Sequence, residues 1–267
     1  APPAIWVWRW PDLGGWVLAV GIALSATIGQ YFWVQAFKAG EINTYRETNP
    51  VKWAEQYSFP AVTSGDVVKS EIPHARPSGI DGFVFNTRRP IFDDWHVREA
   101  LIHAFNFELV NQTLNGGIPP RITSYFGNST LGMVPGAPAE GRVAELLEAF
   151  RAELLPGAMK GYTLPVGDGE ANRKNIRKAT KLLEEAGWTV QDGVLKNAAG
   201  APFTFEILLV NGEDDMISTA SIYVEALKRL GIEARITSCP SVAGILKLTT
   251  EGFGMAAIPP LFVRRQL

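Results

Sequence analysis

Two histidines, one cysteine and one pair of aspartates are the side chains of this sequence that could carry out catalysis or bind a metal. His96 and His103 lie seven positions apart on one expected helix, and no carboxylate or thiolate stands at a spacing that would complete a zinc site with them. Cys239 has no neighbour in sequence that would activate its thiol as a nucleophile. Asp93 and Asp94 could form an acid–base pair, but adjacent carboxylates at a helix start typically cap the helix.

Glycine-rich signatures of catalysis are also missing from the sequence. It contains no Gly-x-Ser-x-Gly elbow and no phosphate-binding loop, and the Gly-Phe-Gly at 252–254 is too short to indicate dinucleotide binding. We therefore predict that the chain is not an enzyme and has no catalytic residue, metal site or cofactor.

Arg88 and Arg89 are the first candidates for ligand binding. They follow directly after an expected strand, and their planar guanidinium groups could meet a carboxylate with paired N–H donors. The alternative is a solvated pair of arginines at a strand end.

Tyr125, Phe126 and Asn128 form the second candidate group, an aromatic and amide cluster in an expected loop. Binding residues often lie on loops, and a peptide of variable sequence is well held by flat aromatic surfaces and side chains with several donors. The alternative is a loop folded on its own aromatic side chains.

The elements that position these residues indicate an α/β fold. The apolar run at 82–86 predicts a strand that Pro90 ends, and a helix over about 95–107 follows. Apolar residues at helical spacing predict two more helices, one at about 143–150 and one at about 176–186 that Gly187 ends as a left-handed cap.

A β-α-β unit is expected after two turns, Asp192-Gly193 and Asn197 to Gly200. Alternating residues predict a strand at 203–209, Asp214 and Asp215 are expected to cap a helix that Gly231 stops, and a second strand follows at 232–236. A crossover helix of this length joins parallel strands, so part of the sheet should be parallel.

Composition places the 267-residue chain among globular proteins, with 46% hydrophobic residues. Lys plus Arg number 25 against 27 for Asp plus Glu, and this balance gives no basic footprint for nucleic acid. The first 40 residues differ from the rest, because 14–37 has no charged residue and is long enough to cross a bilayer as a helix. Membrane contact through 14–37 is one interpretation, and a helix or hairpin buried in a soluble core is the other.

Four segments of the middle zone resemble the extracellular solute-binding proteins of family 5, the dipeptide and oligopeptide receptors of bacterial ABC importers. The segments are GFVFNTRRP at 82–90, with FDD at 92–94 and VREAL at 97–101, then SYFGNS at 124–129, ATKLLEEAGW at 179–188 and LKRLGI at 227–232. The stretch SYFGNS is similar to the branch that takes up longer peptides and peptide-like antibiotics.

That resemblance implies one lobe of a periplasmic binding protein-like fold, a mixed sheet flanked by helices, over residues 41–237. It also implies an oligopeptide or peptide-like ligand, an ABC permease as partner and a periplasmic location. Family members hold the ligand between two lobes and have an acidic residue near aromatic side chains beyond the strand equivalent to 232–236. Nothing after Arg235 resembles that segment, and no first lobe precedes residue 41, so we expect this lobe alone to bind peptide weakly or not at all.

Both ends of the chain resemble other families. GQYFWVQAFKAGE at 29–41 is similar to a helix of the EamA-like drug/metabolite transporters, which predicts an apolar transporter-like helical segment over 1–40. TSCPS at 237–241 and EGFGMAAIP at 251–259 resemble the end of a LysR-type effector-binding domain, which predicts a regulator-like tail over 238–267. These resemblances together predict a composite chain. The alternative predictions are a membrane-integral transporter fragment in the inner membrane and a small-molecule effector domain.

Overall fold

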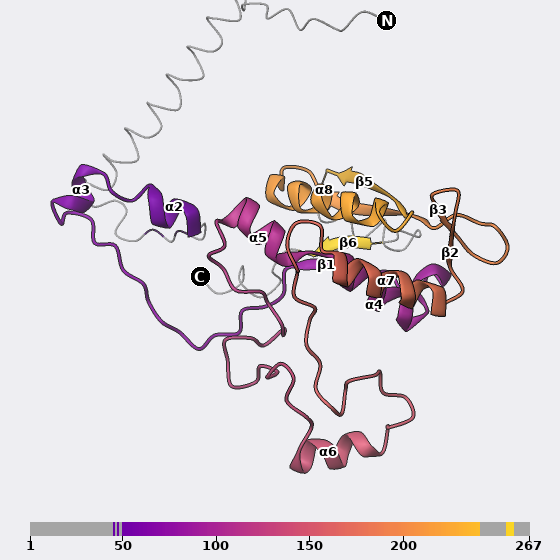
Figure 1. The fold of residues 1–267 in the computed structure, drawn as a ribbon. Coiled ribbons are helices and arrows are strands. Elements are labelled where there is room, and N and C mark those ends of the chain that lie inside the picture. The colour runs from indigo at the N-terminus through magenta and orange to yellow at the C-terminus, as the bar shows by residue number, and fades with distance from the viewer. Residues whose placement is uncertain (1–44, 46, 48–49, 241–254, 259–267) are drawn as a thin grey trace, which may run out of the picture. The chain divides into compact units, whose positions relative to one another are not determined.

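A mixed four-stranded sheet organises the part of the chain that the computed structural model describes, residues 45, 47, 50–240 and 255–258 (Figure 1). Its strands lie in the order β1 (Gly82–Phe85), β6 (Met255–Ile258), β4 (Thr204–Val210) and β5 (Glu233–Cys239). Strand β4 pairs in parallel with both β5 and β6, whereas β1 runs antiparallel to β6. The mixed sheet is the fold class that the sequence predicts.

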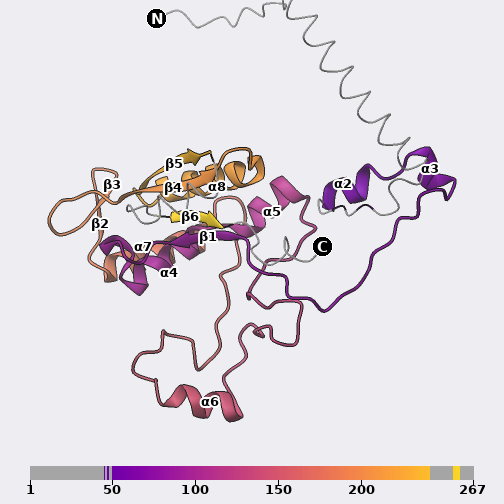
Figure 2. The same cartoon turned by 180° about the vertical axis from the view of Figure 1, so that it is seen from behind.

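The described residues also form helices of very different length. They are α2 (Pro50–Glu55), α3 (Pro60–Thr63), α4 (Trp95–Ala104), α5 (Phe107–Asn115), α6 (Gly141–Glu148), α7 (Arg173–Glu185) and α8 (Asp214–Lys228), with one 3₁₀ turn at Pro90–Phe92. Helices α4 and α7 run side by side in both views (Figures 1 and 2). Backbone contacts group 49–267 as one unit and 1–48 as another, and all of these elements belong to the former.

The predicted β-α-β unit is confirmed as β4, α8 and β5. Strand β5 runs three residues further than expected, to Cys239, and pairs with β4 along its whole length. The aspartates play a different part from the one predicted. Asp214 and Asp215 lie inside the first turn of α8, after the cap residue Glu213, so their negative charge complements the helix dipole instead of capping the end.

The helix predicted at about 95–107 is confirmed as α4, which ends three residues earlier, and a second helix, α5, follows it. Asp94 caps α4 as expected, since its carboxylate accepts a hydrogen bond from the backbone N–H of His96 at 2.7 Å. Helix α4 ends at Ala104, because Phe105 is extended and the side chain of Asn106 accepts from Leu109 N–H to start α5. An asparagine that caps a new helix therefore overrides the continuing apolar spacing.

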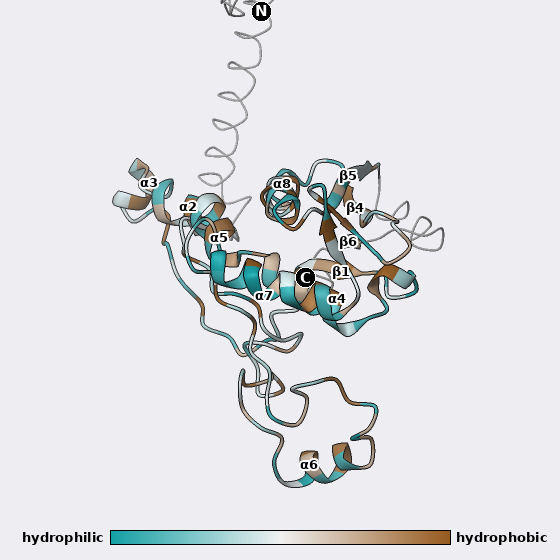
Figure 3. Cartoon of the chain, turned by 45° about the vertical axis from the view of Figure 1, so that its right-hand side comes forward, coloured by the Kyte–Doolittle hydropathy of each residue, from teal (hydrophilic) through white to brown (hydrophobic). Residues whose placement is uncertain are grey.

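Aromatic side chains fill the centre of the core. Phe92 and Phe203 are fully buried, and the ring centroid of Phe203 lies 4.6 Å from that of Trp188 and 6.2 Å from that of Phe92. Phe205 on β4 lies 5.3 Å from Phe92. Strands β4 and β6 are largely brown in the hydropathy view (Figure 3), and Leu208, which the alternation placed among the polar positions of β4, is also buried.

An antiparallel hairpin, of which the sequence predicts only the turn at Asp192-Gly193, joins α7 to β4. Its strands are β2 (Thr189–Gln191) and β3 (Val194–Lys196), and Asp192 and Gly193 between them both have positive φ, as a two-residue hairpin turn requires. Gly231 lies directly under this hairpin at φ +75°, where a Cβ would lie 2.7 Å from the backbone nitrogen of Leu195. Only glycine fits that position.

Helix α6 confirms the helix expected at about 143–150, but its apolar stripe faces solvent. Val143, Leu146 and Phe150 are each more than half exposed. Helical periodicity thus predicted the element correctly without predicting where its apolar face lies.

The terminal zones are described only in part. Residues 14–37, the expected apolar helix, lie outside the described residues, and among those described no helix is both long and apolar enough to cross a bilayer. Within the predicted tail 238–267, Ser238 and Cys239 end strand β5, and Met255–Ile258 form β6 between β1 and β4.

Candidate functional site

Three parallel strands end at the same edge of the sheet, which we call the carboxyl edge. It is formed by Val210 of β4, Cys239 of β5, Ile258 of β6 and the first residue of β1, Gly82, which pairs with Ile258. In open α/β sheets, ligands bind outside the carboxyl ends of the strands. This edge is therefore the first place to look for a binding surface.

Acidic side chains gather at the carboxyl edge. Asp81 precedes β1, and Glu213 lies three residues beyond the end of β4. The pKa of the Asp81 carboxyl is raised, first because it is partly buried and second because Glu213 places another negative charge nearby. Two carboxylates that repel one another favour a cationic group between them. Neither residue was among the binding residues predicted from the sequence.

The turn that contains Tyr125, Phe126 and Asn128 is fastened to the chain that leads into β1. The amide of Asn128 donates to the backbone oxygens of His74 at 2.8 Å and Arg76 at 3.1 Å, and Ser78 N–H donates to Gly127 O at 2.8 Å. Asn128 adopts φ +61°, a left-handed conformation that asparagine tolerates. Its amide therefore holds the turn together.

Tyr125 and Phe126 project from this turn into solvent, 51% and 44% exposed. Ser78 is only four residues before Gly82, so the turn is within a short length of chain of the carboxyl edge. Each of the two rings is therefore partly exposed and partly covered.

Arg88 and Arg89 lie beyond the other end of β1. That strand ends at Phe85, which pairs with Met255, the first residue of β6. Arg88 is exposed, and its Nε donates to Asn86 Oδ1 at 3.1 Å. Strand β1 thus separates the two predicted binding groups, and the structure does not bring the arginines together with Tyr125, Phe126 and Asn128.

A buried polar network, which was not predicted from the sequence, joins α4 to α7. Glu99 and His103, one helical turn apart on α4, are 7% and 5% exposed, with 3.4 Å between Glu99 Oε1 and His103 Nε2. Tyr162 donates its hydroxyl to Glu99 Oε2 at 2.9 Å. His103 Nδ1 lies 3.3 Å from Asn175 Oδ1 on α7. The i, i+4 spacing of glutamate and histidine was the available signal.

Burial and contacts act on Glu99 in opposite directions. Burial by itself would raise the pKa of its carboxyl, but the contacts with His103 and Tyr162 and the charge of Lys178 outweigh burial and lower it. Glu99 is therefore an anion held inside the lobe. Burial and the charge of Glu99 raise the pKa of the Tyr162 hydroxyl, which keeps it a hydrogen-bond donor.

A second set of bonds fixes the segment before α7 to helix α5. Gly167 N–H donates to Glu108 Oε2 at 2.6 Å, and Asn106 donates to Gly169 O at 2.8 Å. A Cβ on Gly167 would lie 2.1 Å from Asn106 Oδ1, so a larger residue there would have to displace the side chain of Asn106. Together with the network around Glu99, these bonds join α4 and α5 to α7 and to the segment that precedes it.

Within residues 45, 47, 50–240 and 255–258, no cluster of three His, Cys, Asp or Glu side chains could hold a metal ion. Cys239 is 3% exposed in strand β5. Asp94 is occupied as a helix cap and contacts His96.

Comparisons with a family profile and with individual proteins both find binding proteins. The profile of the bacterial extracellular solute-binding proteins, family 5, middle segment, matches residues 31–258. A binding protein of Brucella suis biovar 1 is 38% identical over 223 residues, which cover 83% of this chain and 36% of that protein. The peptidoglycan-binding protein YepA of Agrobacterium fabrum is 38% identical over 215 residues, covering 76% of this chain and 34% of YepA.

Among solved structures, the oligopeptide-binding protein AppA of Bacillus subtilis, in complex with a nonapeptide, has the same fold. The TM-score is 0.53 at 19% identity, and the match covers 84% of this chain and 37% of AppA. The chain thus spans little more than a third of the length of the proteins that it matches.

Proposed function

The chain belongs to the bacterial extracellular solute-binding proteins of family 5, and from this premise we propose that it supplies one lobe of a receptor for oligopeptides or peptide-like molecules. The lobe holds its ligand without transforming it. Its place is the periplasm, where it passes the ligand to an ABC permease. The names of the relatives support a peptide or peptide-like ligand, since one is called a peptidoglycan-binding protein and another a peptide-binding protein.

The observation that carries this proposal is the chemistry near the carboxyl edge. Asp81 and Glu213 give that edge the negative charge that suits a peptide's amino terminus. Tyr125 and Phe126 offer exposed aromatic faces that contact apolar and backbone groups of any sequence. A receptor for varied peptides needs both features.

The roles of Arg88 and Arg89 stay a separate part of the proposal. Their position beyond the other end of β1 supports contact with a ligand carboxylate only if the ligand extends past the strand. Shorter peptides would reach the aromatic turn without reaching these arginines.

The proposed extent of the lobe is residues 41–237, with strand β6 of the tail completing its sheet. The likenesses of 1–40 to a transporter helix and of 238–267 to a regulator domain stay predictions. The family match over residues 31–258 supports assigning both β5, which contains Thr237, and β6 to the same lobe.

Removing the aromatic surface tests the proposal. We expect the chain to bind mixed tripeptides to decapeptides weakly, with a Kd on the order of 100 µM or weaker, because one lobe leaves much of the ligand in water. The double variant Tyr125→Ala/Phe126→Ala should weaken binding about tenfold or more, a loss of about 1.4 kcal/mol. Calorimetric titration with the peptide mixture measures both.

Phe150→Ala is the matched control, because Phe150 is a similarly exposed aromatic residue in the turn that follows α6, outside the proposed surface. Its affinity should equal that of the unaltered chain. If the double variant and this control bind peptide equally well, the aromatic turn is not the ligand wall.

A further inference from the structure

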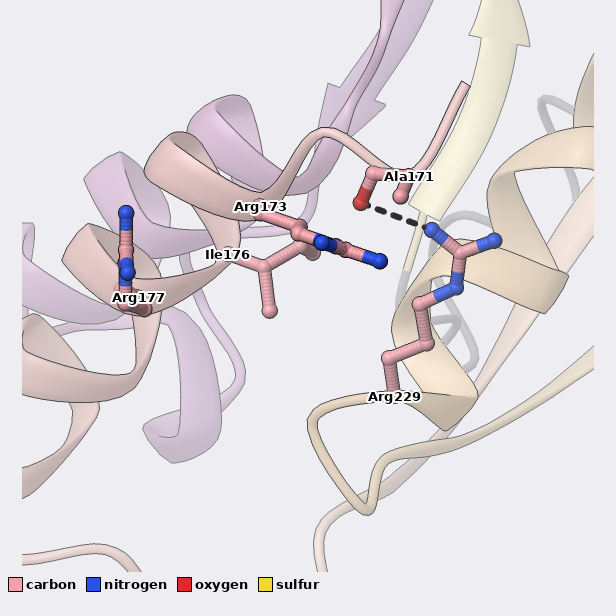
Figure 4. A pocket seen from close by; sticks show the side chains of 5 residues that line it. All are labelled: Ala171, Arg173, Ile176, Arg177 and Arg229. Atoms are coloured by element: carbon pink, nitrogen blue, oxygen red, sulfur yellow. Dashed lines mark hydrogen bonds between the residues drawn. The ribbon is translucent and has the colours of Figure 1, made fainter. Parts of the chain in front are cut away.

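A shallow hollow lies at the junction of the first half of α7 with the end of α8 (Figure 4). Its volume is about 370 Å³, and it is lined by Ala171, Arg173, Ile176, Arg177 and Arg229. Three of its five lining residues are arginines, which come from two different elements of the fold. The sequence reading singled out none of them.

The guanidinium groups of Arg173 and Arg229 point toward one another across the hollow (Figure 4). Arg229 is held in place, because its Nη1 donates to Ala171 O at 2.8 Å. Within the described part of the chain, the side chains of Arg173 and Arg177 have no hydrogen bond or ion pair. Two like charges therefore face each other without a carboxylate between them.

The surrounding helix adds more positive charge. The first nine residues of α7, at 173–181, contain Arg173, Lys174, Arg177, Lys178 and Lys181 and no acidic residue. The amino end of a helix already has a partial positive charge, so cations there are unfavourable unless an anion compensates them. Asp168 and Glu170 precede the helix, and Asp168 accepts a hydrogen bond from Lys174 N–H at 2.9 Å.

The hollow is separate from the carboxyl edge. Helix α8 starts after the carboxyl end of β4 and ends at Lys228, just before β5 begins at Glu233. Arg229 therefore lies near the opposite, amino-terminal ends of the parallel strands. A ligand here would not compete with one held near Tyr125.

We propose that this hollow is an oxyanion site that takes a phosphate group. Arg173 and Arg229 present planar sets of N–H donors that match the oxygens of a phosphate from two sides, and Arg177 adds a third positive charge. Ala171 and Ile176 form a small apolar wall beside them. The phosphate belongs either to a free soluble anion or to a lipid headgroup, and the chemistry of recognition is the same.

Titration of the whole chain tests this site in low-salt, phosphate-free buffer. Binding of inorganic phosphate is detected by changes in the amide chemical shifts of the protein. Binding to vesicles is measured by co-sedimentation, with phosphatidylglycerol vesicles compared with phosphatidylcholine vesicles. We expect binding in at least one arm, and Arg173→Gln should weaken it at least tenfold. Binding to soluble phosphate identifies a free anion, whereas binding only to phosphatidylglycerol identifies a headgroup.

Lys181→Gln is the matched control, since it removes one positive charge from the same helix outside the hollow. It should change the affinity less than twofold. Arg173→Gln removes no described bond, and circular dichroism verifies that the variant is folded. Absence of binding in both arms, or an equal loss in Arg173→Gln and Lys181→Gln, would overturn the proposal.

Discussion

Phe203→Ala should cost the lobe about 3–5 kcal/mol of unfolding free energy. Phe203 is fully buried, and its ring contacts Trp188, Phe92 and Phe205. Truncation leaves a cavity at the point where β4, the hairpin and the 3₁₀ turn meet, and these rings cannot all move to fill it. Urea denaturation followed by circular dichroism measures the loss, which is a large part of a typical domain's stability.

Phe150→Ala serves as the control for the same chemical change at an exposed position. It should shift the free energy of unfolding by no more than about 0.5 kcal/mol. A cost below about 1 kcal/mol for Phe203→Ala would contradict the described core.

Glu99→Leu should destabilise the lobe by about 2–4 kcal/mol at neutral pH. The substitution removes the acceptor of the Tyr162 hydroxyl and the partner of His103, and leaves His103 buried and Tyr162 partly buried without those contacts. Glu184→Leu is the control on the exposed face of α7, with an expected change within about 0.5 kcal/mol. Denaturant titration of the two variants beside the unaltered chain gives the comparison.

The stability contribution of Glu99 should also depend on pH in a definite direction. Since the pKa of Glu99 is lowered in the folded lobe, its ionised form stabilises the fold above its ordinary value of 4.5. That contribution is lost as the pH falls from 4.5 through the lower folded value. The stability difference between the unaltered chain and Glu99→Leu should therefore shrink below pH 4.5, and a difference that grows there would show that Glu99 is not held as an anion.

Local signals predicted much of the fold. The β-α-β unit, the cap at Asp94 and the left-handed cap at Gly187 depend on residues close together in the sequence, and all three are confirmed. The second helix start at Asn106 was also a local signal, but the continuing apolar spacing concealed it. The hairpin was missed because β2 and β3 are short and mostly exposed.

The parts of the candidate site that the sequence did not predict depend on contacts between residues far apart in the chain. In the sequence, Glu99 and His103 are only an i, i+4 pair on a helix. In the fold, Tyr162 contacts Glu99 and Asn175 contacts His103, and each of these partners is more than 60 positions away from the residue that it contacts. The separation of Arg88 and Arg89 from Tyr125 depends on the direction of β1 in the sheet, which its pairing with β6 sets. Sequence spacing predicted the candidate side chains without predicting the end of the strand at which each would lie.

Amide chemical-shift mapping with a saturating peptide mixture tests the central claim most directly, because it detects weak binding and locates it. We expect shifts confined to the carboxyl edge and the aromatic turn, at Ser78, Asp81, Tyr125, Phe126 and Glu213, with the peptides recovered intact. Shifts at other places, no shifts at millimolar peptide, or cleaved peptides would contradict a lobe that holds peptides at this edge.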